Sequence, residues 1–148
     1  MKKENLDPVY DCLLRVRRED STIRRKELQR EQLRSCLTRY VPVTDGVKVQ
    51  SSKVNRLEET EARIDELDHE LDDLNDSKAA SIIRVSDLIE LLDDENEKTV
   101  LTAFYIAGMS MQDTADMVNY SLQHTYRIRK RGIVNLKPHV KDEKNEKK

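Results

Sequence analysis

Basic and hydrogen-bonding side chains gather between residues 121 and 137, and their chemistry suits a polyanion. This stretch carries five Lys or Arg residues and no acidic residue. Guanidinium and ammonium groups bind phosphate oxygens, and Gln and Arg also reach base edges in the major groove of DNA. We therefore expect double-stranded DNA as the partner. The residues that we expect at the contact surface are Ser121, Leu122, Gln123, His124, Tyr126, Arg127, Lys130 and Arg131.

Catalytic and metal chemistry has no comparable signal. The sequence contains no glycine-rich phosphate loop, no nucleophile elbow and no cluster of metal ligands. Its histidines stand apart, with His69 among acidic residues, His124 in the basic stretch and His139 near the end. A single histidine in such a place is usually a surface residue. We expect no enzymatic activity, no metal and no cofactor.

A helix must present the basic stretch if its side chains are to enter a groove of DNA. Ser121 is a suitable N-cap for such a helix. Pro138 predicts that the helix ends at about residue 136 or 137. The residues that should pack inward recur at helical spacing, and they are Thr125, Ile128, Gly132, Ile133 and Leu136.

A second, shorter helix is predicted immediately before it. Ser110 is a good N-cap for residues 111–118, and Asn119 can adopt the left-handed conformation that a sharp turn needs. The small Ala115 lets this helix cross the next one closely. Two helices joined by such a turn, the second with exposed side chains, indicate a helix–turn–helix motif.

A further helix should precede the motif. Residues 100–105 place Val100, Leu101, Phe104 and Tyr105 at helical spacing. The acidic residues 93–95 suit its N-terminus because they complement the helix dipole. Gly108 interrupts the pattern.

The clearest periodicity lies between Leu57 and Leu92. Apolar residues recur by sevens and at the alternate positions between, with Lys78 and Ser81 as polar exceptions. A helix of about 36 residues is roughly 54 Å long, and such a stripe needs a partner. A second copy of the chain, in a homodimer, could cover it, but we favour the N-terminal helix folded back as a hairpin. The stripe consists of Leu57, Ile64, Leu67, Leu71, Leu74, Val85, Leu88 and Leu92.

The N-terminal helix should run from Asp7-Pro8 to about Tyr40. Asp7 suits the N-cap, and Pro42 ends the helix. We expect residues 41–53 to form either a small β-hairpin at Asp45-Gly46 or an irregular linker, with Ser51 or Ser52 capping the next helix. Basic residues on the N-terminal helix are interleaved with acidic ones, so we interpret them as a solvated face rather than a second phosphate site.

Composition supports an all-α fold with a thin core. Charged residues make up 38% of the 148, aromatic residues only 4%, and there are three Gly and three Pro. Residues 54–98 carry 16 acidic and 5 basic residues, whereas residues 99–148 carry 9 basic and 5 acidic ones. The two cysteines have no metal-ligand spacing, so a reducing cytoplasm is the simpler expectation. No run approaches the ~18 apolar residues of a membrane span.

These observations predict a long, coiled-coil-like helical hairpin followed by a C-terminal helix–turn–helix unit. We expect the arm at residues 1–92, with its loop at 41–53. The DNA-binding unit should occupy residues 93–137. Residues 138–148 have no apolar pattern, so we expect a disordered tail.

The C-terminal stretch resembles region four of the sigma-70 family. The whole chain resembles the small phage late transcription regulators of the ArpU and RinA type. The resemblance rests on VQSS at residues 49–52, the long heptad helix, and the ending YSLQHTYRIRKRGIVNL. Tyr120, Ser121, Tyr126 and Arg127 match the pattern of that ending. Thr114 stands where Ile is usual, Thr125 where Val is usual and Gly132 where Ala is usual.

The resemblance implies a sequence-specific activator of phage late genes that works with the host RNA polymerase in the bacterial cytoplasm. By analogy with sigma region four, the base-facing residues would be Leu122, Gln123, Tyr126 and Arg127. Two alternatives remain. A small terminase subunit also combines a helix–turn–helix with further helices, but normally places it first in the chain. A coiled-coil adaptor would bind a protein such as RNA polymerase, with its basic end merely solvated.

Overall fold

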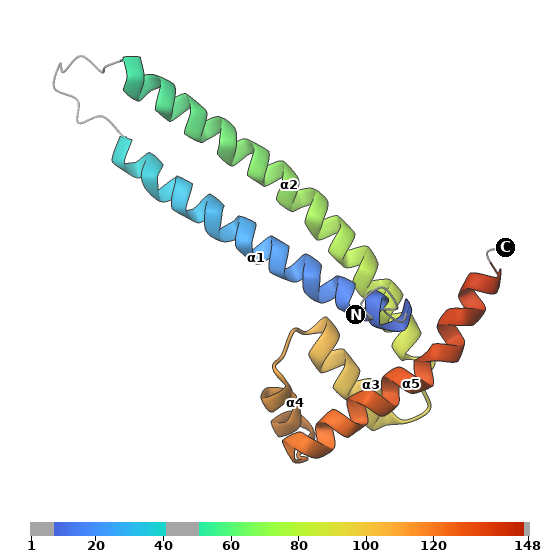
Figure 1. The fold of residues 1–148 in the computed structure, drawn as a ribbon. Helices are drawn as coiled ribbons and strands as arrows, with labels where there is room; N and C mark the ends of the chain where they lie inside the picture. Colours follow the sequence, from blue (N-terminus) through green and yellow to red (C-terminus); the bar gives the residue numbers. More distant parts are fainter. Residues whose placement is uncertain (1–7, 41–50, 147–148) are drawn as a thin grey trace, which may run out of the picture. The chain divides into compact units, whose positions relative to one another are not determined.

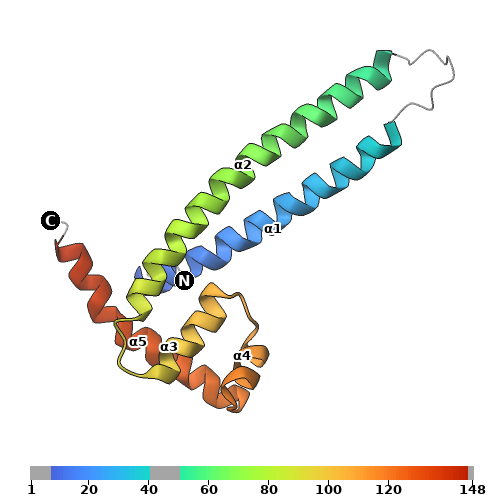
Figure 2. The same cartoon turned by 180° about the vertical axis from the view of Figure 1, so that it is seen from behind.

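The computed structural model describes residues 8–40 and 51–146, and all regular structure within those ranges is helical (Figures 1 and 2). The predicted cap at Asp7 and the predicted turn at Asp45-Gly46 lie outside these residues. The elements in chain order are α1 (Pro8–Tyr40), α2 (Ser51–Ile89), α3 (Glu95–Leu101), the π-helix η2 (Thr102–Ile106), α4 (Met111–Val118) and α5 (Leu122–Glu146).

The chain divides into two compact units, and the division does not fall at the predicted boundary after residue 92. One unit, residues 21–77, contains the second part of α1 and the first part of α2. The other unit combines residues 1–20 with residues 78–148. Both long helices therefore contribute to both units.

In the unit of residues 21–77, α1 and α2 run antiparallel (Figures 1 and 2). The heptad positions Ile64, Leu67 and Leu71 of α2 are buried, as is Ile23 of α1. Ion pairs tie the two helices together beside this seam. Lys26 donates to Glu70 over 2.7 Å, and Arg30 donates to Asp68 over 2.8 Å.

The core of the other unit draws on both ends of the chain. Val9, Leu13 and Val16 from α1 pack in one cluster with residues of α2 and of the C-terminal helices. The predicted unit of residues 93–137 lacks the parts of α1 and α2 that belong to this core. Sequence periodicity does not show which turns of a long helix pack in the heptad seam and which pack elsewhere. The other fully buried or nearly buried members of the cluster are Val85, Leu88, Ile89, Leu92, Leu101, Tyr105, Ile133, Leu136 and Val140.

The helix predicted after residue 93 begins as expected but does not stay α-helical. Asp94 is its N-cap, since a side-chain oxygen accepts hydrogen bonds from the backbone N–H groups of Asn96 and Glu97. From Thr102 the chain winds as the π-helix η2, in which the N–H of Ala107 bonds the carbonyl of Thr102 at 3.0 Å. A π-turn has wider hydrogen-bonded rings than an α-helix and is common at functional sites.

The prediction that Pro138 ends the last helix is wrong. α5 continues to Glu146, with Pro138 inside it, so the backbone of residues 138–146 is helical and not the expected disordered tail. Proline removes one backbone donor but fixes φ near a helical value, so a helix can continue beyond it. Val140 is 8% exposed and belongs to the core, and its burial favours the continued helix over the expected break.

Candidate nucleic-acid interface

The turn between α4 and α5 is built from the predicted capping residues. The hydroxyl oxygen of Ser110 accepts a hydrogen bond from the N–H of Asp113 at 3.0 Å, and that of Ser121 accepts one from His124 at 3.1 Å. Asn119 has φ 61° and ψ 39°, the left-handed conformation. These three predictions are confirmed. Together they fix the point where α5 begins and the direction in which its first turn leaves α4.

Two buried threonines reinforce these caps in the same way. Thr114 Oγ1 donates to the carbonyl of Ser110, and Thr125 Oγ1 donates to the carbonyl of Ser121, each over 2.8 Å. Both threonines are fully buried. A buried hydroxyl without a partner would cost stability, but here each has one. The two departures from the expected Ile and Val are thus accommodated without an unsatisfied polar atom.

Gly132 lets α5 lie close to α3. A Cβ added at this position would stand 3.0 Å from Cδ1 of Leu101 and 3.4 Å from Cβ of Glu97. Real Cβ atoms rarely approach a neighbour so closely. Glycine at this position therefore allows this close packing. The predicted inner face of α5 is confirmed, because Thr125, Ile128, Gly132, Ile133 and Leu136 are all buried.

A polar network fixes the rotation of α5 about its own axis. Glu97 of α3 is 2% exposed, yet it carries a carboxylate. One of its oxygens accepts a hydrogen bond from Arg131 Nε at 2.7 Å, and the other accepts one from Asn135 Nδ2 at 3.0 Å. Arg131 also donates to Asp94 at 3.3 Å. Since a buried carboxylate needs such partners, other rotations of α5 are disfavoured.

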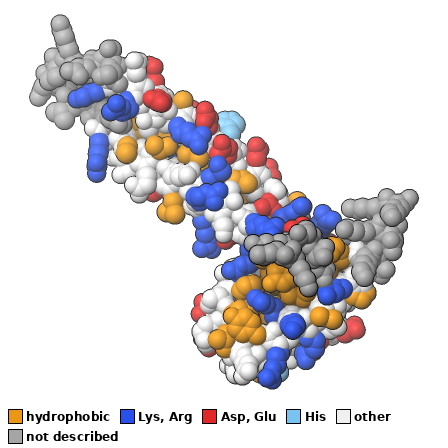
Figure 3. All heavy atoms as spheres, in the orientation of Figure 1, with side chains coloured by type: hydrophobic (Ala, Val, Ile, Leu, Met, Phe, Trp, Pro, Cys, Tyr) orange, Lys and Arg blue, Asp and Glu red, His pale blue; other side chains and the backbone are white. Residues whose placement is uncertain are grey.

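The outer face of α5 remains open to solvent. Leu122, Gln123, Tyr126, Arg127 and Lys130 are exposed, and their spacing places them on one side of the helix. Figure 3 shows Lys and Arg side chains among hydrophobic ones over the surface where Figure 1 draws α5. This combination offers hydrogen-bonding, apolar and cationic groups on one helix face.

Three of the predicted contact residues have structural roles within the unit. The hydroxyl of Ser121 is engaged as a cap. The ring of His124 packs edge-on against Tyr120, with centroids 4.8 Å apart. The guanidinium of Arg131 pairs with Glu97, and the hydrogen bond to Glu97 raises the pKa of Arg131. Arg131 is therefore engaged in an ion pair that was not predicted from the sequence.

A cluster of aromatic rings and arginine side chains lies next to Tyr126. The Arg129 guanidinium carbon lies 4.8 Å from the centre of the Phe104 ring and 5.3 Å from that of Tyr126. Arg17 of α1 lies 4.1 Å from the same Phe104 ring and donates to the Phe104 carbonyl at 2.6 Å. These cation–π contacts hold Arg129 along the helix surface next to Tyr126.

A groove of about 500 Å³ follows the outer face towards the C-terminus of α5. Tyr10 of α1 and Tyr126 lie at it, together with three cationic residues. Tyr10 was not predicted at this site, because a contact from the opposite end of the chain has no local signal in the sequence. Arg129 and Lys137 were not among the residues expected at the contact surface. The three cationic residues are Arg129, Lys130 and Lys137, and the apolar Ile133 and Val134 complete the lining.

The described residues also bear on metal sites and membrane spans. Across residues 8–40 and 51–146, no group of three or more His, Cys, Asp or Glu side chains could hold a metal ion. None of the helices in that part of the chain is long and apolar enough to cross a membrane.

Comparison with protein-family models, with curated proteins and with solved structures finds no match to this chain.

Proposed function

We propose that α4, the turn at Asn119 and α5 form a helix–turn–helix motif that binds double-stranded DNA, and that the protein is a transcription regulator. The observation that carries this proposal is the outer face of α5. Gln123, Arg127 and Lys130 are exposed there, and within the described residues neither Arg127 nor Lys130 makes an ion pair. A capped helix with free cations and an amide on one face matches the requirements of major-groove binding.

The contacts that hold α5 in place also favour this proposal. A recognition helix must be held at a fixed rotation so that its first two turns face the base pairs. The Glu97–Arg131–Asn135 network and the close packing at Gly132 supply that constraint. The groove beyond Tyr126 adds cationic side chains that suit phosphates along the same strand.

The resemblance to late transcription regulators makes the proposal more specific. On that basis, we propose that the protein activates phage late genes together with the host RNA polymerase, inside the bacterial cell. The long α1–α2 pair would then serve as a coiled-coil-like arm.

The test begins with the full chain and a random pool of DNA duplexes at low salt. Repeated selection should enrich a preferred sequence. Replacing Gln123 or Arg127 with Ala should then weaken binding to that sequence by about 1–3 kcal/mol and relax the preference. Arg84→Ala is the matched control, because Arg84 is an exposed arginine outside α5. Absence of duplex binding, or unchanged discrimination in both variants, would refute the proposal.

A further inference from the structure

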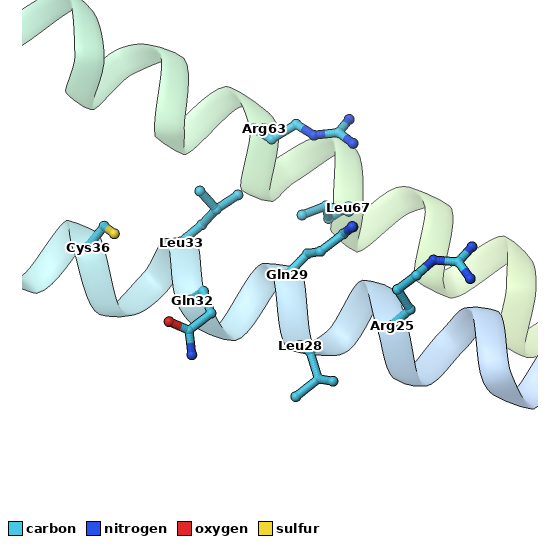
Figure 4. Close-up of a pocket in the computed structure, with 8 residues that line it drawn as sticks. All are labelled: Arg25, Leu28, Gln29, Gln32, Leu33, Cys36, Arg63 and Leu67. Atoms are coloured by element: carbon cyan, nitrogen blue, oxygen red, sulfur yellow. The ribbon is translucent and has the colours of Figure 1, made fainter.

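The unit of residues 21–77 leaves an open groove beside the seam of its two helices. The groove has a volume of about 610 Å³. Leu67 at its floor is fully buried, Leu33 is half buried, and Leu28 is 66% exposed. In Figure 4, Leu33 points towards α2 and Leu28 points away from it. Two helices alone thus leave part of their apolar surface uncovered.

The α1 side of this groove is mostly uncharged, although this part of α1 is rich in charge. Residues 21–40 carry six basic and two acidic residues. The α1 residues at the groove are nevertheless mostly neutral, namely Leu28, Gln29, Gln32, Leu33 and Cys36, beside the single cation Arg25. Such a neutral strip, bordered by charged rows, is the pattern of a helix–helix contact surface.

Opposite charges border the groove on its two helices. On α1, Arg25 and Arg39 are exposed and lie two heptads apart, with the neutral Gln32 midway between them. On α2, Glu59, Glu66 and Asp73 recur by sevens and are also exposed. Arg63, which lines the groove, donates to Glu66 at 2.7 Å, so Glu66 lies next to this edge. Heptad spacing puts Glu59 and Asp73 on the same side of α2.

These border charges are distinct from those that hold the unit together. Lys26, Arg30 and Arg34 of α1 pair with Glu70 and Asp68 of α2. Within the described residues, by contrast, Arg25, Arg39, Glu59 and Asp73 make no ion pair.

We propose that two copies of this chain associate groove to groove through residues 21–77, forming a four-helix bundle. A twofold contact brings α1 of each copy against α2 of the other. The basic row of α1 then faces the acidic row of the partner's α2, as charged rows do beside coiled-coil seams. Leu28 and Leu33 of both copies fill the space between. A second copy fits better than a different protein because one chain supplies both complementary rows.

The first experiment replaces Leu28 with Glu in the full chain and measures mass by sedimentation equilibrium. Because Leu28 is 66% exposed, this change should leave the helical content of the single chain intact. The dissociation constant of the dimer should rise at least about tenfold. Ile83→Glu is the matched control, since Ile83 is 63% exposed but lies outside this unit, and its dimer should be unaffected.

The second experiment exchanges the charges between two variants. One variant carries Arg25→Glu and Arg39→Glu, and the other carries Glu59→Lys and Asp73→Lys. Each alone should dimerise more weakly than the unaltered chain, because like charges face each other. Mixed in equal amounts, they should form a heterodimer, in which both facing pairs of rows are again opposite in charge.

The outcomes separate cleanly. A dimer weakened by Leu28→Glu and restored in the mixture supports the proposal. A monomeric chain at all concentrations, or a dimer indifferent to both sets of changes, overturns it. A loss of circular dichroism signal by the Leu28→Glu variant also counts against it, since that would show Leu28 to be needed within one copy.

Discussion

The guanidinium of Arg131 donates from Nε to a carboxylate oxygen of Glu97 over 2.7 Å, and Glu97 is almost completely buried. Replacing Glu97 with Ala should lower the free energy of unfolding by about 2–4 kcal/mol, because it removes two hydrogen bonds and leaves Asn135 without its acceptor. Urea denaturation measures this change. Glu95→Ala, on the same helix but at a side chain 83% exposed, should change it by less than about 1 kcal/mol.

Lys130 and Arg131 are neighbours on α5 and should respond differently to salt. Lys130→Ala should weaken binding to all duplex sequences alike and lower the slope of log affinity against log salt by about one unit. Arg131→Ala should instead lower protein stability, because its guanidinium serves Glu97 and Asp94. Titrations of a labelled duplex at several salt concentrations, on variants first checked for folding, compare the two. Equal slopes for Lys130→Ala and the unaltered protein would assign Lys130 to solvent.

Because Gly132 lies close to Leu101, the effect of replacing Gly132 should depend on the residue at position 101. Gly132→Ala alone should destabilise the protein by roughly 1 kcal/mol, because overpacking against the buried Leu101 outweighs the better helix propensity of alanine. In a Leu101→Ala background the same change should stabilise it by about 1 kcal/mol. A double-mutant cycle of unfolding free energies measures the difference. Additive effects would show that the two residues do not press on each other.

Tyr105 is fully buried, and among residues 8–40 and 51–146 its hydroxyl oxygen has no hydrogen-bond partner. Burial raises the pKa of Tyr105 above the ordinary value of 10.0. The folded state therefore holds this proton more tightly than the unfolded state does, and the associated stability is present below pH 10.0 and lost as the pH rises further. Tyr105→Phe should change stability at neutral pH by less than about 1 kcal/mol and reduce the alkaline loss.

Unfolding free energies at neutral pH and at two alkaline values measure this effect. Tyr120→Phe is the control, because Tyr120 is 39% exposed. An unchanged alkaline loss in Tyr105→Phe would assign that loss to other groups.

Local signals in the sequence were sufficient for the part of the site nearest the turn. Ser110, Asn119 and Ser121 are recognisable because caps and left-handed turns depend on the residue itself and its immediate neighbours. The bounds of α4 and the inner face of α5 followed from these caps and from helical spacing. Interactions within about four residues decide such features.

Features that depend on distant residues could not be predicted. Glu97 stands in an acidic run, and nothing in that run distinguishes the one carboxylate that Arg131 and Asn135 bury. A proline is a reliable helix stop only where the residues after it do not pack in the core. Val140, two residues after Pro138, does pack in the core. The division of α1 between two units likewise follows from where its first turns pack.

Val9 and Val140 share one hydrophobic core, and this has a consequence for synthesis on the ribosome. The chain emerges from its N-terminus, so the core around the first turns of α1 stays incomplete until α5 has left the exit tunnel. The helical pair of residues 21–77 has its contacts earlier and can form in the meantime. Premature termination anywhere before about residue 140 would therefore yield a product with an unfinished core, which quality-control proteases recognise by its exposed apolar surface.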